Sequence, residues 1–555
     1  MKNTLALFLL LAATGGFSQT PATIKTSPLT KEQVHSLALL SEVWGFLKYY
    51  HPAVAQGQQN WDSVLIQKIP LYLGATGREA ISGLTAAWLS ETGVPPACKK
   101  CDNAVPDSLK FNLDLSWINE NNFSKAVVDQ LLFIRDNRNQ GGNRFVSLKS
   151  YSLQFAEKSY NAPAFQYPDA GYRLLMLFRY WNIVNYFSPY KYICGRDWKD
   201  ILQEKIPVFY GAADTLALQL EFVKLVGCLN DGHANFYLTP VLQRFFGANH
   251  YPPFGCKYID GQLVVSRLYN DSLARIIRMQ PGDVLTDING EKVSDKMTRL
   301  MGYSMASNDA IRPALFGSYF LFTGADSNFI VTKTRKGKKI IDSFAMPPYT
   351  GPSVDTSLPW RLLDGNIGYV NMGNLVVSQV DAMMKALAGT RGIVFDVRYY
   401  PQNTAAAIVS YLCSKPFIFC RTSIPDIDYP GVFRFGTEHL SGRVNEHPYA
   451  GKLVILADEG SASHAEYSIM CLQAAAKTMT IGSTTAGQDG NFSQRIYLPS
   501  GLFTRFSSLG IYYPDGTIAQ RKGVRIDKTV IPTIRGLQEG RDEVLEAGIN
   551  YIISN

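Results

Sequence analysis

The stretch that decides the fold reads Val454-Ile455-Leu456-Ala457-Asp458-Glu459-Gly460-Ser461-Ala462-Ser463-His464-Ala465-Glu466. Its apolar start predicts a buried strand, its small residues predict a turn, and residues 465–476 predict a helix. A serine at the start of such a helix lies where backbone N–H groups and the helix dipole stabilise a developing oxyanion. Serines also cap helices without any catalytic role. The stretch alone therefore leaves capping and catalysis open.

Strand-like and helix-like segments alternate on both sides of this turn. The pattern predicts buried strands over residues 366–371, 392–397 and 479–482, and a helix after Thr404. A terminal amphipathic helix is predicted through residues 540–545. This alternation is typical of an α/β layer in which helices cover a sheet. We therefore expect an α/β core over residues 346–555 of a multidomain α+β chain.

The first half of the chain contains a diverged duplication at a constant offset of 137 residues. Apolar residues at helical spacing recur in both copies, so each copy is expected to be a helical unit whose tryptophans pack in the core. We place a first helical repeat with a polar connector at residues 19–165 and a second repeat at residues 166–249. The clearest matching pairs are Trp44 and Trp181, Trp61 and Trp198, and Pro70 and Pro207.

Residues 250–345 change to short β-like runs. The segment Ile277–Gly290 resembles the helix-to-strand part of a PDZ domain, with a turn at Pro281-Gly282-Asp283 and a tight hairpin at Asn289-Gly290. PDZ domains add an extended peptide to a sheet edge and hold its terminal carboxylate with backbone amides. By this resemblance, Phe254 and Gly255 are the expected peptide-binding residues. A small β-domain with a purely structural role is the alternative.

The N-terminus is typical of an export signal. Lys2 precedes an apolar run over residues 5–13, and small residues follow up to Ser18. We expect a signal peptide at residues 1–18 and a mature chain from Gln19, periplasmic or secreted. No later segment has the roughly 18 apolar residues that a membrane helix needs, so no integral membrane segment is expected in the mature chain.

Charge and cysteine content exclude some classes of partner and cofactor. The formal net charge is +8, but Lys and Arg are scattered along the chain, so nucleic-acid binding is not indicated. Cys98 and Cys101 are a close pair that favours a local disulfide over a zinc site, because no second pair at zinc-ligand spacing accompanies them. The other six cysteines are expected in the core. We predict neither a metal nor an organic cofactor.

Most of the mature chain resembles the C-terminal processing (tail-specific) serine peptidase family. The resemblance rests on the helical N-terminal part, the PDZ-like part, Gly460–Glu466 and the run Ile481–Gly487. It implies a catalytic core of the crotonase or Clp-protease type with Ser463 as the nucleophile. The family's catalytic lysine corresponds to Gln488, and a neutral amide cannot accept the serine proton. Leu229-Asn230-Asp231-Gly232-His233-Ala234 resembles the histidine segment of the tricorn-like and retinoid-binding-protein-like branch, which makes His233 the expected general base.

Polar groups near the nucleophile are candidates for supporting roles. Glu466 and Asp489 are candidates to orient His233, and Gln488 is a candidate to hydrogen-bond near the nucleophile. Polar groups in a helix first turn or a loop also occur without such a role, and this alternative stays open. The resemblance implies an oxyanion hole formed by the backbone N–H groups of His464 and Asn403. Gln402 and Asn403 replace the family's paired glycines, and asparagine is the residue after glycine that best tolerates a left-handed backbone.

These residues predict an exported serine peptidase that cleaves polypeptides through an acyl-enzyme at Ser463. The alternative from another class is a weakly active or inactive peptide- or ligand-binding protein of the same fold. A serine hydrolase for a non-peptide ester or amide is a third hypothesis.

Overall fold

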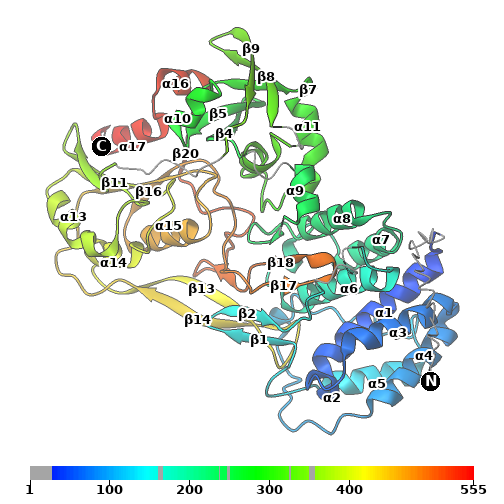
Figure 1. Cartoon of the computed structure of the whole chain (residues 1–555). Coiled ribbons are helices and arrows are strands. Elements are labelled where there is room, and N and C mark those ends of the chain that lie inside the picture. Colours follow the sequence, from blue (N-terminus) through cyan, green and yellow to red (C-terminus); the bar gives the residue numbers. More distant parts are fainter. Residues whose placement is uncertain are drawn as a thin grey trace, which may run out of the picture.

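The computed structural model describes residues 28–554, apart from 161–164, 166, 237, 247–250, 324–326 and 349–356. The predicted signal peptide at residues 1–18 and the predicted mature start at Gln19 lie outside the described residues. Figure 1 shows three regions in chain order: a helical region, a small sheet and a larger sheet with helices on both faces. Within the described part of the chain, every helix is too short or too polar to cross a membrane.

The helical region contains two tryptophan pairs with the same geometry. The indole N–H of Trp44 donates to the carbonyl of Trp61, and the indole of Trp61 donates back to Trp44, both at 3.0 Å. Trp181 and Trp198 exchange the same two bonds at 2.7 and 3.0 Å. All four side chains are buried, as expected for core tryptophans. The helices of this region are α1 (Lys31–Tyr50), α2 (Pro52–Ala55), α3 (Trp61–Gly74), α4 (Gly77–Thr92), α5 (Lys125–Asp136), α6 (Ala170–Phe187), α7 (Trp198–Tyr210), α8 (Thr215–Gly227) and α9 (Pro240–Phe246).

The predicted polar connector has structure of its own. It contains α5 and the hairpin of β1 (Val146–Lys149) and β2 (Ser152–Phe155). Cys98 and Cys101 form the predicted local disulfide. The other cysteines are free, and all of them except Cys228 are buried.

The small sheet has the strand order β4-β5-β6-β8-β9, and β7 pairs with β6. Asn289 and Gly290 connect β6 to β7 with φ values of +52° and +81°, as a tight type I′ hairpin requires. Apolar side chains of α16 (Ile534–Glu539) pack against this sheet. The elements are β4 (Phe254–Ile259), β5 (Gln262–Leu268), α10 (Asp271–Ile276), β6 (Val284–Ile288), β7 (Glu291–Lys292), α11 (Val293–Leu300), α12 (Arg312–Leu315), η5 (Phe316–Phe320), β8 (Asn328–Arg335) and β9 (Lys338–Ala345).

The larger sheet has the order β10-β11-β12-β15-β16-β20 and is parallel from β11 to β20. Alternate residues of β15 face opposite layers: Leu453 and Ile455 pack under α13, α14 and α15, whereas Val454 and Leu456 pack against α17. This two-sided burial explains the continuous apolar runs in the sequence. The elements are β10 (Trp360–Leu363), β11 (Ile367–Asn371), α13 (Val380–Leu387), β12 (Gly392–Asp396), α14 (Ala405–Leu412), β15 (Lys452–Ala457), α15 (His464–Ala475), β16 (Thr478–Gly482), β20 (Lys528–Thr529) and α17 (Glu543–Ser554).

Two smaller sheets complete the region, and the C-terminus differs from its prediction. The long hairpin of β13 (Phe417–Pro425) and β14 (Phe433–Ser441) pairs with β19 (Gly510–Tyr512). The strand β3 (Asn235–Phe236) pairs with β18 (Phe503–Arg505), which pairs with β17 (Ile496–Tyr497). The predicted terminal helix is present as α17, but it begins at Glu543. It does not include residues 540–542, because Gly540 ends α16 (Ile534–Glu539) in a left-handed conformation.

Candidate active site

Ser463 lies at the sharp turn between β15 and α15. Its φ of 53° and ψ of −115° are strained for a residue with a side chain, and such strain is concentrated at functional sites. A hydrogen bond to another loop stabilises the turn, because the backbone N–H of Ser463 donates to the carbonyl of Gln488 at 2.8 Å. The hydroxyl group is thereby presented at the N-terminus of a 12-residue helix.

Ser461, two residues earlier, has a different environment. Its hydroxyl donates to the carbonyl of Val397 at 2.9 Å and accepts from the N–H of Asp458 at 3.2 Å. The side chain is fully buried. Ser461 therefore joins the loop after β12 to the loop after β15, and its hydroxyl is not available for attack.

His233 reaches the nucleophile from the helical region. Its Nε2 lies 2.8 Å from the Ser463 Oγ, although the two residues are 230 positions apart in the sequence. The residues after His233 form β3, and the pairing of Asn235 with Arg505 and of Phe236 with Thr504 fixes this segment against β18. The local fold thus brings together the two residues predicted as nucleophile and base.

The other ring nitrogen of His233 contacts Ser507, which the sequence analysis did not single out. The Nδ1 of His233 lies 2.9 Å from the Ser507 Oγ, and the Ser507 hydroxyl donates to the Oδ1 of Asp231 at 2.9 Å. Asp231 also accepts the backbone N–H of Ser507 at 2.7 Å and that of His233 at 3.0 Å. With the Ser507 proton directed to Asp231, Nδ1–H of His233 donates to Ser507 and Nε2 is left free to accept from Ser463.

Burial and neighbouring charges set the protonation of His233. Burial lowers the pKa of His233 below its ordinary value of 6.5. The carboxylate of Asp231 opposes this effect and raises the pKa, whereas the guanidinium of Arg505 lowers it further. The neutral imidazole that a general base requires is therefore favoured at neutral pH.

Neither carboxyl group that was predicted to orient His233 contacts it. Glu466 instead supports the nucleophile turn: it accepts from the Thr485 hydroxyl at 2.6 Å, from the N–H groups of Gly487 and Gln488 at 2.8 Å each, and from the N–H of Ser463 at 3.3 Å. Burial raises the pKa of Glu466 to about 7, although these four donors lower it. The prediction that Glu466 orients His233 fails because Glu466 follows Ser463 on α15, and its side chain cannot reach the segment before β3 that carries His233.

Asp489 is buried beside Glu466, and desolvation raises its pKa well above the ordinary value. Its Oδ1 accepts the N–H of Gly490 at 2.8 Å, and its own N–H donates to the side chain of Gln520 at 2.8 Å. The side chain of Gln488 packs on the Cα of Gly232, where an added Cβ would lie 1.9 Å from its Oε1. Gln488 therefore contacts the segment that carries His233, while its carbonyl contacts the nucleophile.

The two backbone N–H groups predicted to form an oxyanion hole belong to His464 and Asn403. His464 is the first residue of α15, and Asn403 has the left-handed backbone expected for it, with φ of 57°. Among the described residues, neither N–H donates to a protein acceptor. Backbone N–H groups without a protein acceptor are the kind of donor that stabilises an oxyanion.

The small sheet contacts the nucleophile loop through an ion-pair cluster. The ammonium group of Lys257 on β4 lies 2.9 Å from Asp458 and 2.5 Å from Glu459, and all three side chains are at most 15% exposed. Attraction from Lys257 and Arg267 lowers the pKa of Asp458 to about 2, against its burial. Phe254 and Gly255, the predicted peptide-binding residues, begin β4 and are both buried.

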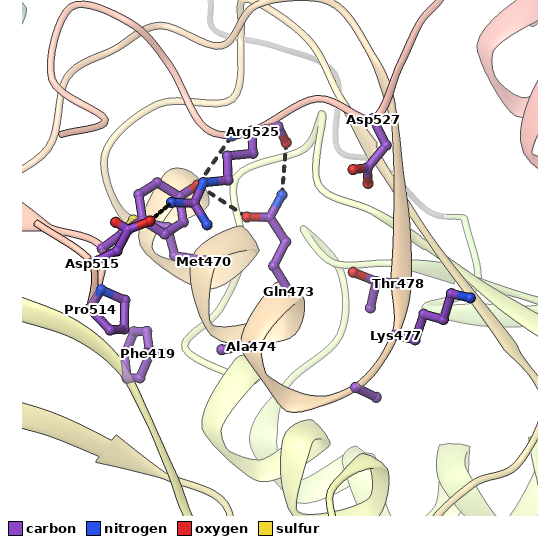
Figure 2. Close-up of a pocket in the computed structure, with 12 residues that line it drawn as sticks. Phe419, Met470, Gln473, Ala474, Lys477, Thr478, Pro514, Asp515, Arg525 and Asp527 are labelled. Carbon is purple, nitrogen blue, oxygen red and sulfur yellow. Dashed lines mark hydrogen bonds and ion pairs between the residues drawn. The ribbon is translucent and has the colours of Figure 1, made fainter. Parts of the chain in front are cut away.

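One cavity lies at the end of α15, and a second lies next to the segment that carries His233. One of about 430 Å³ lies at the C-terminal end of α15, roughly 16 Å along the helix from Ser463, and is shown in Figure 2. Several of its polar groups are paired with one another, since Arg525 contacts Asp515 and the side chain of Gln473 donates to the Arg525 carbonyl. The other, of about 410 Å³, contains Gly232, Ala234 and Gln488 and so adjoins the Ser463–His233 pair. Within the described residues, no group of three or more His, Cys, Asp or Glu side chains is placed to hold a metal.

Comparison with known proteins gives a family match for part of the chain. Residues 366–530 match the model of peptidase family S41. The chain is a serine-type peptidase with a family S41 domain. The matched residues run from β11 to β20 and include Ser463, whereas His233 lies outside them. A comparison with curated proteins gave no match.

One solved peptidase structure, mature CPAF, shares the fold of this chain, and two others show a weaker likeness. Mature CPAF complexed with lactacystin is similar with a TM-score of 0.52 and 12% sequence identity, over 70% of this chain and 99% of that one. The photosystem II D1 C-terminal processing protease has a TM-score of 0.38 and 17% identity, over 69% of this chain and 99% of that one. Tricorn protease has a TM-score of 0.34 and 14% identity, over 69% of this chain and 37% of its own. The likeness to CPAF extends well beyond the family S41 domain, and at this identity it concerns the fold.

Proposed function

We propose that the chain is an exported peptidase that cleaves polypeptides through an acyl-enzyme at Ser463, with His233 as general base. The observation that carries the proposal is the 2.8 Å contact between the Ser463 hydroxyl and His233 Nε2, backed by Ser507 and Asp231. A nucleophile within hydrogen-bond reach of a base, and a base held by a third group, is the arrangement on which serine hydrolases depend.

In the proposed reaction, Ser463 Oγ attacks the scissile carbonyl carbon while its proton moves to Nε2 of His233. The carbonyl oxygen becomes an oxyanion that accepts from the N–H groups of His464 and Asn403. The C–N bond then breaks, and the leaving amine takes the proton from Nε2. Water then attacks the ester carbonyl and gives one proton to Nε2. The bond between the acyl carbon and Ser463 Oγ breaks, Nε2 returns the proton to Oγ, and the carboxylic acid leaves.

Ser507 and Asp231 are proposed as positioning residues for His233. The Ser507 oxygen accepts the Nδ1 proton and keeps the ring in the tautomer that leaves Nε2 free. Asp231 accepts the Ser507 proton, so the positive charge that forms on the imidazole faces a carboxylate through one hydroxyl group. Glu466 in turn is proposed to hold the strained turn of Ser463 by accepting from both sides of it.

The finer division of the chain belongs to the same proposal. We assign residues 19–165 and 166–249 to two helical repeats, 250–345 to a PDZ-like domain and 346–555 to the α/β core. The repeated tryptophan pairs support the first two assignments. Peptide capture along β4, at the end of the small sheet, is supported by the strand order and by the Lys257 contacts, which would connect a captured peptide to the nucleophile loop.

The opposing hypothesis is a binding protein that keeps the fold without turnover. Gln488 in place of a lysine base, and the Gln402-Asn403 pair in place of two glycines, favour it. An unfolded polypeptide incubated with the parent protein and with Ser463→Ala separates the two. The proposal predicts new peptide termini, read by mass spectrometry, with the parent protein alone. Intact polypeptide in both samples, from protein that is folded by circular dichroism, would favour the binding protein.

A further inference from the structure

The 410 Å³ cavity beside the active site is lined by aromatic rings and by no charged side chain among the described residues. The rings come from four separate parts of the chain and contact one another: Phe246 lies 5.4 Å from Phe320, 5.5 Å from Tyr303 and 6.0 Å from Phe236 between ring centroids. Tyr251 and Tyr319 form a further pair at 5.9 Å. A pocket of this size with mostly apolar walls is suited to a large neutral group.

Hydrogen bonds connect the chain beside the cavity to the loops that carry His233 and follow β16. The hydroxyl of Ser307 accepts the N–H of Gly232 at 2.7 Å, and the side chain of Asn308 donates to the Thr485 carbonyl at 2.8 Å. Leu315, on the cavity wall, and Ala462, next to the nucleophile, pack against the same small apolar cluster. The cavity and the Ser463–His233 pair are therefore built on one packed unit.

The chemistry of the proposed reaction determines which substrate residue passes this cavity. His233 has to deliver its proton to the leaving amine, so the residue that follows the scissile bond lies alongside the imidazole. Both chain neighbours of His233, Gly232 and Ala234, line the cavity. Resting on the proposed peptidase function, we infer that this cavity is a specificity pocket for a large neutral apolar side chain, aromatic above all, on the first residue after the scissile bond.

A charged side chain is excluded by the same features. Lys, Arg, Asp or Glu in this position would lose its water of hydration and find no ionic partner among the described lining residues. A glycine or alanine would leave the aromatic walls unfilled. Cleavage should therefore depend on both the size and the charge of the residue after the bond.

The test uses a set of peptides that differ only at the residue after the scissile bond, which is Phe, Leu, Gly, Asp or Lys. We expect kcat/KM to be about tenfold or more higher for Phe than for Gly, and lower for Asp and Lys than for Gly. Ser318→Trp, which fills the pocket from η5, should bring the Phe-to-Gly ratio close to one. Phe246→Ala, which widens it, should shift the preference from Phe towards Trp. Ser410→Trp, on α14 away from the cavity, is the matched control and should keep the parental ratio.

Equal cleavage of the Phe and Gly peptides by the parent protein would overturn the inference, as would a dependence on the residue before the bond that Ser318→Trp abolishes. Peptide binding to the Ser463→Ala variant distinguishes a failure of the pocket inference from a failure of the proposed peptidase function. That variant should bind the Phe peptide about tenfold or more tightly than the Gly peptide, and lose the difference when combined with Ser318→Trp. Equal binding of both peptides to Ser463→Ala overturns the pocket even if the parent protein cleaves neither.

Discussion

Replacing Ser507 with alanine tests the hydrogen-bond chain behind His233. The change removes the acceptor of the Nδ1 proton and leaves that N–H buried without a partner, which costs about 1–3 kcal/mol. If this whole penalty destabilises the transition state for acylation, in which the imidazole must be held in place, acylation slows between about 5-fold and 150-fold. The assay is the second-order rate of labelling by a fluorophosphonate, because it measures attack by the serine without requiring a known substrate.

Ser508→Ala is the matched control for this variant. Ser508 is also fully buried, and its hydroxyl accepts one bond, from the N–H of Leu153 at 3.1 Å, but it does not contact His233. It should lose a similar amount of stability in urea while keeping a labelling rate within about twofold of the parent. Parental labelling by Ser507→Ala, or equal slowing in both variants, would refute a positioning role for Ser507.

Further expectations concern pH, the neighbouring serine and the small sheet. Because burial lowers the pKa of His233, the labelling rate should fall with acidification only below about pH 6.5. Arg505→Gln removes a positive charge that lowers this pKa, so the acidic fall of the labelling rate should move to higher pH. An unchanged pH profile would contradict the assignment of His233 as the base. Ser461→Ala should cost about 1–3 kcal/mol of unfolding free energy in urea yet still be labelled, since its hydroxyl bonds only to backbone groups. Lys257→Met should cost about 3 kcal/mol of unfolding free energy and slow labelling, because Asp458 and Glu459 lose their shared ammonium partner. The exposed control Lys339→Met should change neither quantity, and equal behaviour of the two lysine variants would contradict the coupling between the small sheet and the nucleophile loop.

The parts of the fold that local pattern determines were predictable. The strands at 367–371, 392–396 and 478–482 and the helix from His464 follow from apolar runs and small-residue turns that are contiguous in the sequence. The turn at Asn289-Gly290 and the left-handed Asn403 follow from residue type alone. The tryptophan pairs were visible as a constant offset, although their reciprocal indole bonds were not.

The third member of the site was not predictable by the same means. Ser507 is 274 residues from His233, and it arrives through the pairing of β3 with β18, strands of two and three residues that carry no periodic signal. Glu466 and Asp489 were chosen for their charge and nearness in sequence, but a fixed helix direction turns Glu466 towards the 485–488 loop. Asp231 stood in the quoted histidine segment, and its spacing of two residues from His233 was the available signal.

The most direct test of the account is to identify the residue that a fluorophosphonate modifies in the folded chain. Mass spectrometry of the digested, labelled protein should place the adduct on Ser463, with no adduct in Ser463→Ala and a greatly reduced one in His233→Ala. An adduct on another residue, or labelling of Ser463→Ala at the parental rate, would contradict the assignment of the nucleophile and with it the proposed acyl-enzyme.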